Sequence, residues 1–210
     1  MAEKTATAYL YVLDTLADWE IGHITAEMSS GRFDNRASKP KLVRIGNGLQ
    51  PIKTMGGIAI TPEMDMNSVA FKEGDVLILP GGDTWMDGRN GKILDIAAGL
   101  LKKNVAVAAI CGATIALANK GVLDNRRHTS NDLGYLKAMC PEYRGGEHYV
   151  NEPAVVDGNL ITASGFGALE FSHEVFGKIG FMKPDTLAAW YGLYKTRDAK
   201  YFFQLMESLK

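Results

Sequence analysis

Short apolar runs alternate along the chain with segments whose apolar positions recur at helical spacing. The apolar runs predict strands at 8–13, 41–45, 75–79, 105–110 and 160–163. The helical spacing predicts helices at 18–30, 91–104 and 113–120. Because strands that alternate with helices build a sheet through crossover connections, we expect an α/β fold with a mostly parallel sheet and helices on both faces.

Individual runs refine this expectation. The run at 105–110 is apolar throughout, which indicates a strand buried on both faces, since a half-exposed strand would alternate with polar residues. Gly56 and Gly57 stand between apolar flanks and predict a hairpin or bent strand pair over 54–61. Further runs at 149–150, 154–156 and 160–163, around the turn residues 157–159, predict a last segment of the sheet.

The tail from Ala168 to Lys210 is mostly helical in pattern and is interrupted near Pro184. Its aromatic residues must be buried somewhere, whether over the sheet, in a dimer contact or in a lid over the site. The whole chain has 210 residues, which favours one domain over 1–210 with a helical C-terminal extension from about 184.

Charge and hydropathy narrow the range of partners. Lys and Arg total 23 against 24 Asp and Glu, so the chain lacks the positive charge that holds a nucleic-acid backbone. The longest apolar stretch, 105–118, is too short to cross a bilayer, and the N-terminus resembles no signal peptide. We therefore expect a cytoplasmic protein with a small-molecule substrate and with neither nucleic acid nor membrane as a partner.

The most informative residue is Cys111, which lies between the predicted strand 105–110 and the predicted helix 113–120. Ala109 and Ala113 stand two residues to either side, as a nucleophile elbow requires, because larger side chains would collide in so tight a turn. Such a turn places the sulfur at the carboxyl edge of the sheet, next to a helix N-terminus. A buried and inert cysteine at the end of a strand is the alternative interpretation.

Two neighbouring segments favour a reactive cysteine. Pro80-Gly81-Gly82 ends the strand at 75–79, so the N–H groups of Gly82 and Gly112 are candidates for an oxyanion hole. Glu20 opens the first helix at another strand end, from which its carboxyl group could reach the sulfur. The alternatives are an ordinary turn at the glycines and a glutamate that only complements the helix dipole.

Four segments resemble the ThiJ/PfpI family of the class I glutamine-amidotransferase-like superfamily, over about residues 8–180. They are Ala17-Asp18-Trp19-Glu20, Leu79-Pro80-Gly81-Gly82, Ala108-Ala109-Ile110-Cys111-Gly112-Ala113 and His128-Thr129-Ser130-Asn131. The first and third are typical of a small bacterial branch. The resemblance implies a flavodoxin-like three-layer sandwich, usually a homodimer, with the reactive cysteine at Cys111 and its glutamate partner at Glu20. Members of this family include peptidases, glyoxalase-like and deglycase-like enzymes and oxidation-sensing chaperones.

The sequence departs from the family pattern at its histidines. In PfpI-like members a histidine follows the cysteine directly, whereas Gly112 does so here. Other members place a histidine two positions beyond a threonine, where this chain has Asn131. His128 precedes that threonine and should point in another direction. A peptidase mechanism would therefore lack its usual base, although Asn131, His128 and Trp85 stay candidates for neighbours of the site.

The remaining chemistry-bearing residues suggest no separate site. His23 could face the same cleft as Glu20, and His148 could approach it from a loop, but a surface or partly buried position is the favoured interpretation for both. Cys140 beside Pro141 is interpreted as structural. No spacing of His, Cys, Asp or Glu predicts a metal, and no motif predicts a cofactor.

Two hypotheses for the function follow. In the first, Cys111 is the nucleophile of a hydrolase or amidotransferase-like enzyme that acts on a small carbonyl or amide substrate, with a protonated Glu20 as its acid/base partner. In the second, the chain is a non-enzymatic sensor of oxidative stress, or a chaperone, in which Cys111 is oxidised to the sulfinate.

Overall fold

The fold was obtained as a computed structural model, which describes residues 5–35, 37 and 39–210. Its centre is a seven-stranded sheet in the order β5-β2-β1-β6-β7-β9-β8. All neighbouring strands are parallel except β8 and β9. The strands are β1 (Thr7–Tyr11), β2 (Lys41–Gly46), β5 (Met64–Asp65), β6 (Val76–Leu79), β7 (Ala106–Ile110), β8 (Ala154–Asp157) and β9 (Leu160–Ala163).

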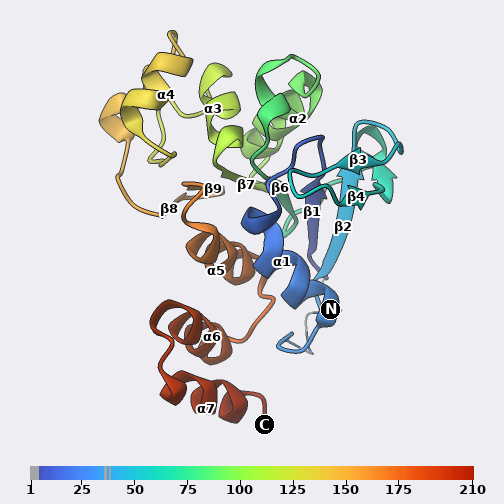
Figure 1. The fold of residues 1–210 in the computed structure, drawn as a ribbon, viewed down its shortest axis with the longest axis vertical. Coiled ribbons are helices and arrows are strands. Elements are labelled where there is room, and N and C mark those ends of the chain that lie inside the picture. The colour runs from blue at the N-terminus through green and yellow to red at the C-terminus, as the bar shows by residue number, and fades with distance from the viewer. Residues whose placement is uncertain (1–4, 36, 38) are drawn as a thin grey trace.

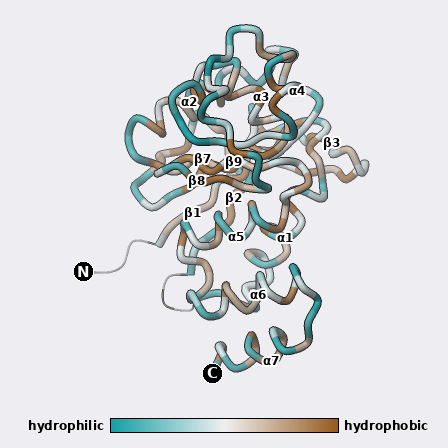
Figure 2. The backbone as a smooth tube through the Cα atoms, turned by 90° about the vertical axis from the view of Figure 1, so that its left-hand side faces the viewer, coloured by the Kyte–Doolittle hydropathy of each residue, from teal (hydrophilic) through white to brown (hydrophobic). Residues whose placement is uncertain are grey.

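Helices cover both faces of this sheet (Figure 1). The α-helices are α1 (Asp18–Ser30), α2 (Gly91–Lys102), α3 (Gly112–Asn119), α4 (Leu133–Met139), α5 (Ala168–Ile179), α6 (Pro184–Thr196) and α7 (Ala199–Ser208). Helices α2 and α3 lie on one face, and α1 and α5 lie on the other, as both backbone views show (Figures 1 and 2). The arrangement is a flavodoxin-like three-layer sandwich, which confirms the predicted fold class.

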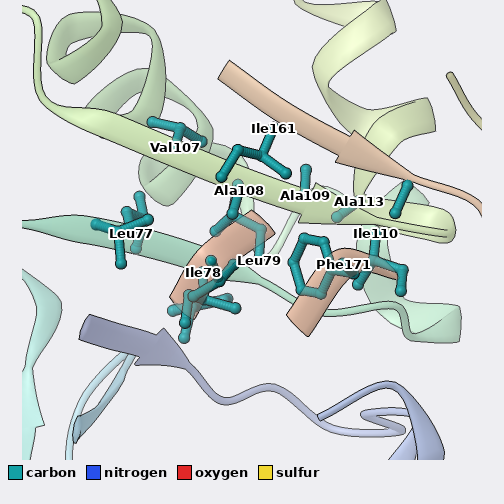
Figure 3. Close-up of a cluster of buried hydrophobic side chains, with 14 of the residues drawn as sticks. Leu77, Ile78, Leu79, Val107, Ala108, Ala109, Ile110, Ala113, Ile161 and Phe171 are labelled. Atoms are coloured by element: carbon teal, nitrogen blue, oxygen red, sulfur yellow. The ribbon is translucent and has the colours of Figure 1, made fainter. Parts of the chain in front are cut away.

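The two central strands carry the core. Every residue of β6 and β7 is buried, because helices pack on both of their faces. Leu77, Ile78, Val107 and Ala108 meet Phe171 of α5 in one continuous apolar cluster (Figure 3). This packing holds the carboxyl ends of β6 and β7 in place, and the loops that follow these strands carry the candidate site.

The short elements differ from the sequence-based expectation in part. The predicted hairpin is confirmed, with strands β3 (Ile52–Lys53) and β4 (Ala59–Ile60) and with Gly57 at a positive φ of 82° in the turn. Residues 149–150 form no strand, since only an isolated bridge joins Tyr149 to His128. Strand β5 and helix α4 were not predicted, because two residues carry no alternation and α4 buries a single side chain, Leu136.

Helices α6 and α7 form a further layer below α1 and α5 (Figures 1 and 2). Pro184 opens α6, where the missing N–H of a proline costs nothing. Trp190 of α6 is fully buried, and its Nε1–H donates to Oε1 of Glu27 in α1 at 3.1 Å. Glu27 also accepts from Nε of Arg32 at 2.6 Å. Trp190 is thus buried against the helix layer rather than directly on the sheet, whereas Tyr194, Phe202 and Phe203 of the tail stay 39%, 47% and 69% exposed.

Candidate active site

Cys111 occupies a strained turn between β7 and α3. Its φ of 56° and ψ of −123° are costly for a residue with a side chain, by about 1–3 kcal/mol. Hydrogen bonds hold the turn, from Cys111 N–H to Ala163 O at 3.0 Å and from the Thr114 hydroxyl to Cys111 O at 2.6 Å. The half-buried thiol therefore sits at the carboxyl edge of the sheet, as expected of a nucleophile elbow.

Glu20 lies beside this thiol and is completely buried. Its Oε2 accepts the N–H of Gly81 at 2.6 Å, whereas Oε1 makes no hydrogen bond within the described residues. A Cβ atom built on Gly165 would lie 3.0 Å from Sγ of Cys111 and 3.3 Å from Oε1 of Glu20, so sulfur and Oε1 border the same point. The structure thus brings together the two residues singled out in the sequence.

Asn131 contacts the sulfur from the other side. Its Nδ2–H donates to Sγ of Cys111 at 3.3 Å, and its Oδ1 accepts the N–H of Gly165 at 2.8 Å. The second bond decides which way the amide faces, because only its nitrogen can then point to the sulfur. Gly165 was not predicted as a residue of the site. Its position in the run Ser164-Gly165-Phe166-Gly167, directly after the last predicted strand, could have indicated it.

The thiol and the carboxyl group influence each other's titration. Burial raises the pKa of Glu20, and the Gly81 N–H and the neighbouring thiol partly offset this rise. Burial raises the pKa of Cys111 to about 11, and the charge of Glu20 adds to the effect of burial, while Asn131 and the Gly112 N–H oppose it. With a pKa of about 11, the sulfur of Cys111 keeps its proton at neutral pH.

A sulfur that keeps its proton differs from the reactive cysteine expected from the sequence, whereas the protonated state of Glu20 stays a prediction. The difference arises because the sulfur is buried beside the carboxyl group of Glu20 and faces no cationic side chain among the described neighbours that shift its pKa. Glu20 lies where it can exchange a proton with the sulfur.

The two candidate oxyanion donors also lie near each other. A Cβ atom built on Gly112 would lie 3.1 Å from the oxygen and 3.6 Å from the nitrogen of Gly82, so the two backbone segments run side by side. Within the part of the chain that the structure describes, the N–H of Gly82 donates to no acceptor. A free N–H beside the nucleophile can stabilise a developing negative charge on oxygen.

A pocket of about 350 Å³ opens over the sulfur. Trp85, a predicted neighbour of the site, lines it and is buried, with its Nε1–H donating to Pro80 O at 2.8 Å. Much of the remaining wall is formed by apolar and aromatic side chains from several elements, namely Trp19, Met55, Met86, Ile115, Tyr135 and Met139. The pocket thus combines an apolar entrance with the polar group of Cys111, Glu20 and Asn131 at its base.

None of the chain's four histidines, all of them within the described residues, lines this pocket. The His128 ring is fully buried elsewhere, with Nδ1 at 2.7 Å from Arg126 O and Nε2 at 2.6 Å from the Tyr143 hydroxyl. His23 packs edge-on against Trp190 of α6. His148 lies 3.6 Å from the carboxylate of its neighbour Glu147, and His173 lies 3.0 Å from that of its neighbour Glu174. The structure thus does not bring His128 or His23 to the sulfur.

Several other expectations concern residues away from the pocket. Cys140 is buried, and its thiol donates to Ile115 O at 3.4 Å, which suits a packed structural residue. Over residues 5–35, 37 and 39–210, no group of three His, Cys, Asp or Glu side chains is arranged to hold a metal ion. Of the described helices, none has the length and apolar character needed to span a bilayer.

Comparisons with known proteins agree with this fold and site. The chain is 45% identical to the uncharacterized protease YoaZ of Bacillus subtilis, over 98% of this chain and 99% of that relative. It is 31% identical to the uncharacterized protease YdeA of the same organism, over 93% of each chain. A crystal structure of a ThiJ/PfpI family protein from Bacillus anthracis matches 99% of this chain and 98% of its own, with 46% identity and a TM-score of 0.93. Residues 6–177 match the DJ-1/PfpI family, and the chain belongs to that family.

Proposed function

We propose that the chain is a cysteine-dependent hydrolase or amidotransferase-like enzyme that acts on a small carbonyl or amide substrate. The observation that carries this proposal is the buried Oε1 of Glu20, which has no hydrogen-bond partner within the described residues and borders the sulfur of Cys111. An unpaired carboxylate oxygen is costly to bury, and its position suits a group that takes up a proton during the reaction. The names of the Bacillus relatives, both called proteases, point to the same class of chemistry.

The reaction would begin with transfer of the thiol proton from Cys111 to Oε1 of Glu20. The raised pKa of Glu20 favours this transfer, because it makes the carboxylate a stronger base than an exposed one. The Nδ2–H of Asn131 then stabilises the thiolate. Sulfur attacks the substrate carbon, and the electron pair of the C=O bond moves to oxygen, where the N–H groups of Gly82 and Gly112 stabilise the charge.

The second half of the reaction returns the proton. The carboxyl group of Glu20 donates it to the leaving group, which departs and leaves a thioester on Cys111. Water then attacks the thioester carbon and gives a proton to Glu20, the C–S bond breaks, and the sulfur takes up that proton as the acid product leaves. With an aldehyde the proton goes to the oxygen and gives a hemithioacetal; for glyoxal, the C–H proton then passes by way of Glu20 to the neighbouring carbonyl carbon, which converts the hemithioacetal into a thioester that water hydrolyses in the same way. In cysteine and serine peptidases a histidine takes the proton of the nucleophile and returns it to the amide nitrogen as the bond breaks, and no histidine of the described residues lines this pocket. We therefore expect aldehydes and other reactive carbonyl compounds to be better substrates than peptides.

The alternative, an oxidative-stress sensor or chaperone, uses the same sulfur. A pKa of about 11 at Cys111 slows the reaction with peroxide and the attack on a carbonyl substrate alike, because the thiolate is the reacting form in both. The free N–H of Gly82 favours the enzyme, since a sensor does not require a donor for an oxyanion.

The experiment measures turnover of glyoxal, glutamine and a short peptide by the wild-type chain and by Cys111→Ser, Glu20→Gln and Cys140→Ala. We expect turnover of the carbonyl compound to vanish in Cys111→Ser and to fall about 100- to 10,000-fold in Glu20→Gln, the range of a general acid/base. The buried Cys140→Ala variant serves as the matched control and should keep its activity. Equal turnover in Cys111→Ser and wild type would refute the proposal. Selective dioxidation of Cys111 by mild peroxide, without turnover of any substrate, would favour the sensor instead.

A further inference from the structure

A second and larger pocket, of about 550 Å³, lies on the far side of Asn131 from Trp85. Asn131 lines both pockets, and Ser164 and Phe166, which flank Gly165 beside the sulfur, line the larger one. The larger pocket therefore adjoins the group that we propose to be catalytic.

The C-terminal extension supplies one wall of this second pocket. Tyr194 and Lys195 of α6 and Arg197 at its end line it, and all three lie beyond residue 177, where the match to the family ends. The wall is held in place, since Lys195 forms an ion pair with Glu170 of α5 at 2.6 Å. The burial of Trp190 anchors the same helix on α1. A fixed wall from outside the family core is suited to setting ligand specificity.

The charges of the pocket separate into a paired set and an unpaired set. Lys195 and Glu170 neutralise each other. Within the described residues, the guanidinium of Arg197 and the carboxylate of Glu152 form no ion pair and no side-chain hydrogen bond, with each other or with any other group. The pocket thus contains one uncompensated positive charge and one uncompensated negative charge.

The same pocket also has apolar surface. The Phe166 ring is 95% exposed, and Pro153 and Leu169 lie in the same wall. An aromatic side chain so exposed beside a nucleophile can pack on a ligand without first leaving other contacts. The ligand that matches all of these features carries a carboxylate, an ammonium group and an apolar portion.

We propose that this second pocket binds the amino-acid portion of the substrate, a free amino acid whose side chain carries the reactive carbonyl group. Arg197 binds its carboxylate, Glu152 binds its ammonium group, and the reactive carbonyl group extends past Asn131 to Cys111. The inference rests on the proposed function for the identity of the reacting group. It adds that the substrate is zwitterionic and that the C-terminal extension recognises it.

The test compares four alkylating reagents that share the iodoacetamide group and differ in the arm attached to it. The arm of Nε-iodoacetyl-lysine is zwitterionic, and the arm of N-pentyl-iodoacetamide carries no charge. The arm of 6-(iodoacetamido)hexanoate carries only a carboxylate, and the arm of N-iodoacetyl-cadaverine carries only an ammonium group. In each reaction the sulfur of Cys111 forms the C–S bond while the C–I bond breaks, iodide leaves with the bonding pair, and the thiol proton passes to Glu20 or to the buffer. The rate at Cys111 is read by peptide mass spectrometry.

We expect the zwitterionic reagent to alkylate Cys111 about three- to tenfold faster than the neutral one, a range set by partly exposed charge pairs. Arg197→Gln should remove the increase in rate that the carboxylate of the reagent confers. Glu152→Gln should remove the increase in rate that the ammonium group confers. Lys200→Gln, on α7 and outside the pocket, is the matched control and should preserve the wild-type ratio. Equal rates for all four reagents, or an unchanged ratio in Arg197→Gln, would overturn the inference.

The same data separate this inference from the proposed function. The neutral reagent reports the reactivity of the thiol alone, whereas the ratio between reagents reports the pocket. A calorimetric titration of Cys111→Ser with Nε-acetyl-lysine measures binding without any reaction of the sulfur. Binding that is weakened by Arg197→Gln supports the pocket even if no turnover is ever found, and absence of binding contradicts it even if turnover is found.

Discussion

Replacing Glu20 with glutamine should lower the pH at which Cys111 becomes reactive. In the wild-type chain, burial, the charge of Glu20 and its interaction with the thiol together raise the pKa of Cys111 from 9.0 to about 11. Glutamine has nearly the shape of glutamate, so it removes the charge and leaves the burial unchanged. Because burial is the largest single cause, part of the rise should remain, and we expect a midpoint of about 10.

The sign of this effect follows from the charge. A carboxylate beside the sulfur disfavours the thiolate, so its removal increases the thiolate fraction at any pH below the midpoint. A fall of about one pH unit in the midpoint means about tenfold faster alkylation at pH 7.5, since the thiolate is the reacting species. Turnover of a carbonyl substrate should fall in the same variant, because its acid/base group is lost. A more reactive sulfur in a less active protein is the signature of a general base.

The assay is the rate of iodoacetamide alkylation at Cys111 between pH 6 and about 12, read by site-resolved mass spectrometry so that Cys140 does not contribute. Asp83→Asn is the control, because Asp83 lines the same pocket without appearing among the groups that shift the pKa of the thiol. Its midpoint should equal that of the wild type. A higher midpoint in Glu20→Gln would show that the resting carboxyl group is protonated and donates to a thiolate, which contradicts the charge distribution argued here.

Three further substitutions test the surroundings of the site. Gly165→Ala would place a Cβ atom 3.0 Å from Sγ of Cys111. Alkylation of Cys111 should therefore slow about tenfold at an unchanged melting temperature. An unchanged alkylation rate would show that the loop around residue 165 moves aside freely. Glu27→Gln weakens the ion pair that links α1 to the extension, and urea titration should show a loss of about 1–3 kcal/mol of unfolding free energy, whereas a stability equal to the wild type would mean that the pair is dispensable. Gly192→Ala would bring a Cβ atom within 2.4 Å of the Tyr201 ring, so amide exchange should accelerate in residues 199–208 but not in β7, and uniform protection would contradict this local effect.

The parts of the site that the sequence could predict are those that depend on local structure. The elbow at Cys111 requires small neighbours within two residues, and the glycines after β6 directly follow an apolar strand. Glu20 was accessible to the same reasoning because it opens a helix that follows a strand. Since the carboxyl ends of parallel strands meet at one edge of the sheet, local signals sufficed to bring these three segments together.

The remaining features depend on contacts between distant segments. Gly165 reaches the sulfur only because β9 pairs with β7 out of sequence order, and nothing in residues 160–167 alone reveals this neighbour. The position of the His128 side chain could not be predicted without that of Tyr143, whose hydroxyl group forms a hydrogen bond with Nε2 of the His128 ring. The direction of the change in the pKa of Cys111 depended first on how deeply the thiol itself is buried and then on the charge of Glu20, and burial is a property of the packed structure rather than of a motif.

The two pockets around Asn131 suggest a division of roles within the chain. A thiol with a pKa of about 11 reacts slowly with small electrophiles that meet it by diffusion, so reactivity alone gives little turnover. A substrate held beyond Asn131 stays in contact with the sulfur long enough for the proton to reach Glu20, and its effective concentration at the nucleophile rises accordingly. On this proposal the family core supplies the chemistry, and Arg197 of the extension, together with Glu152, determines which molecules undergo it.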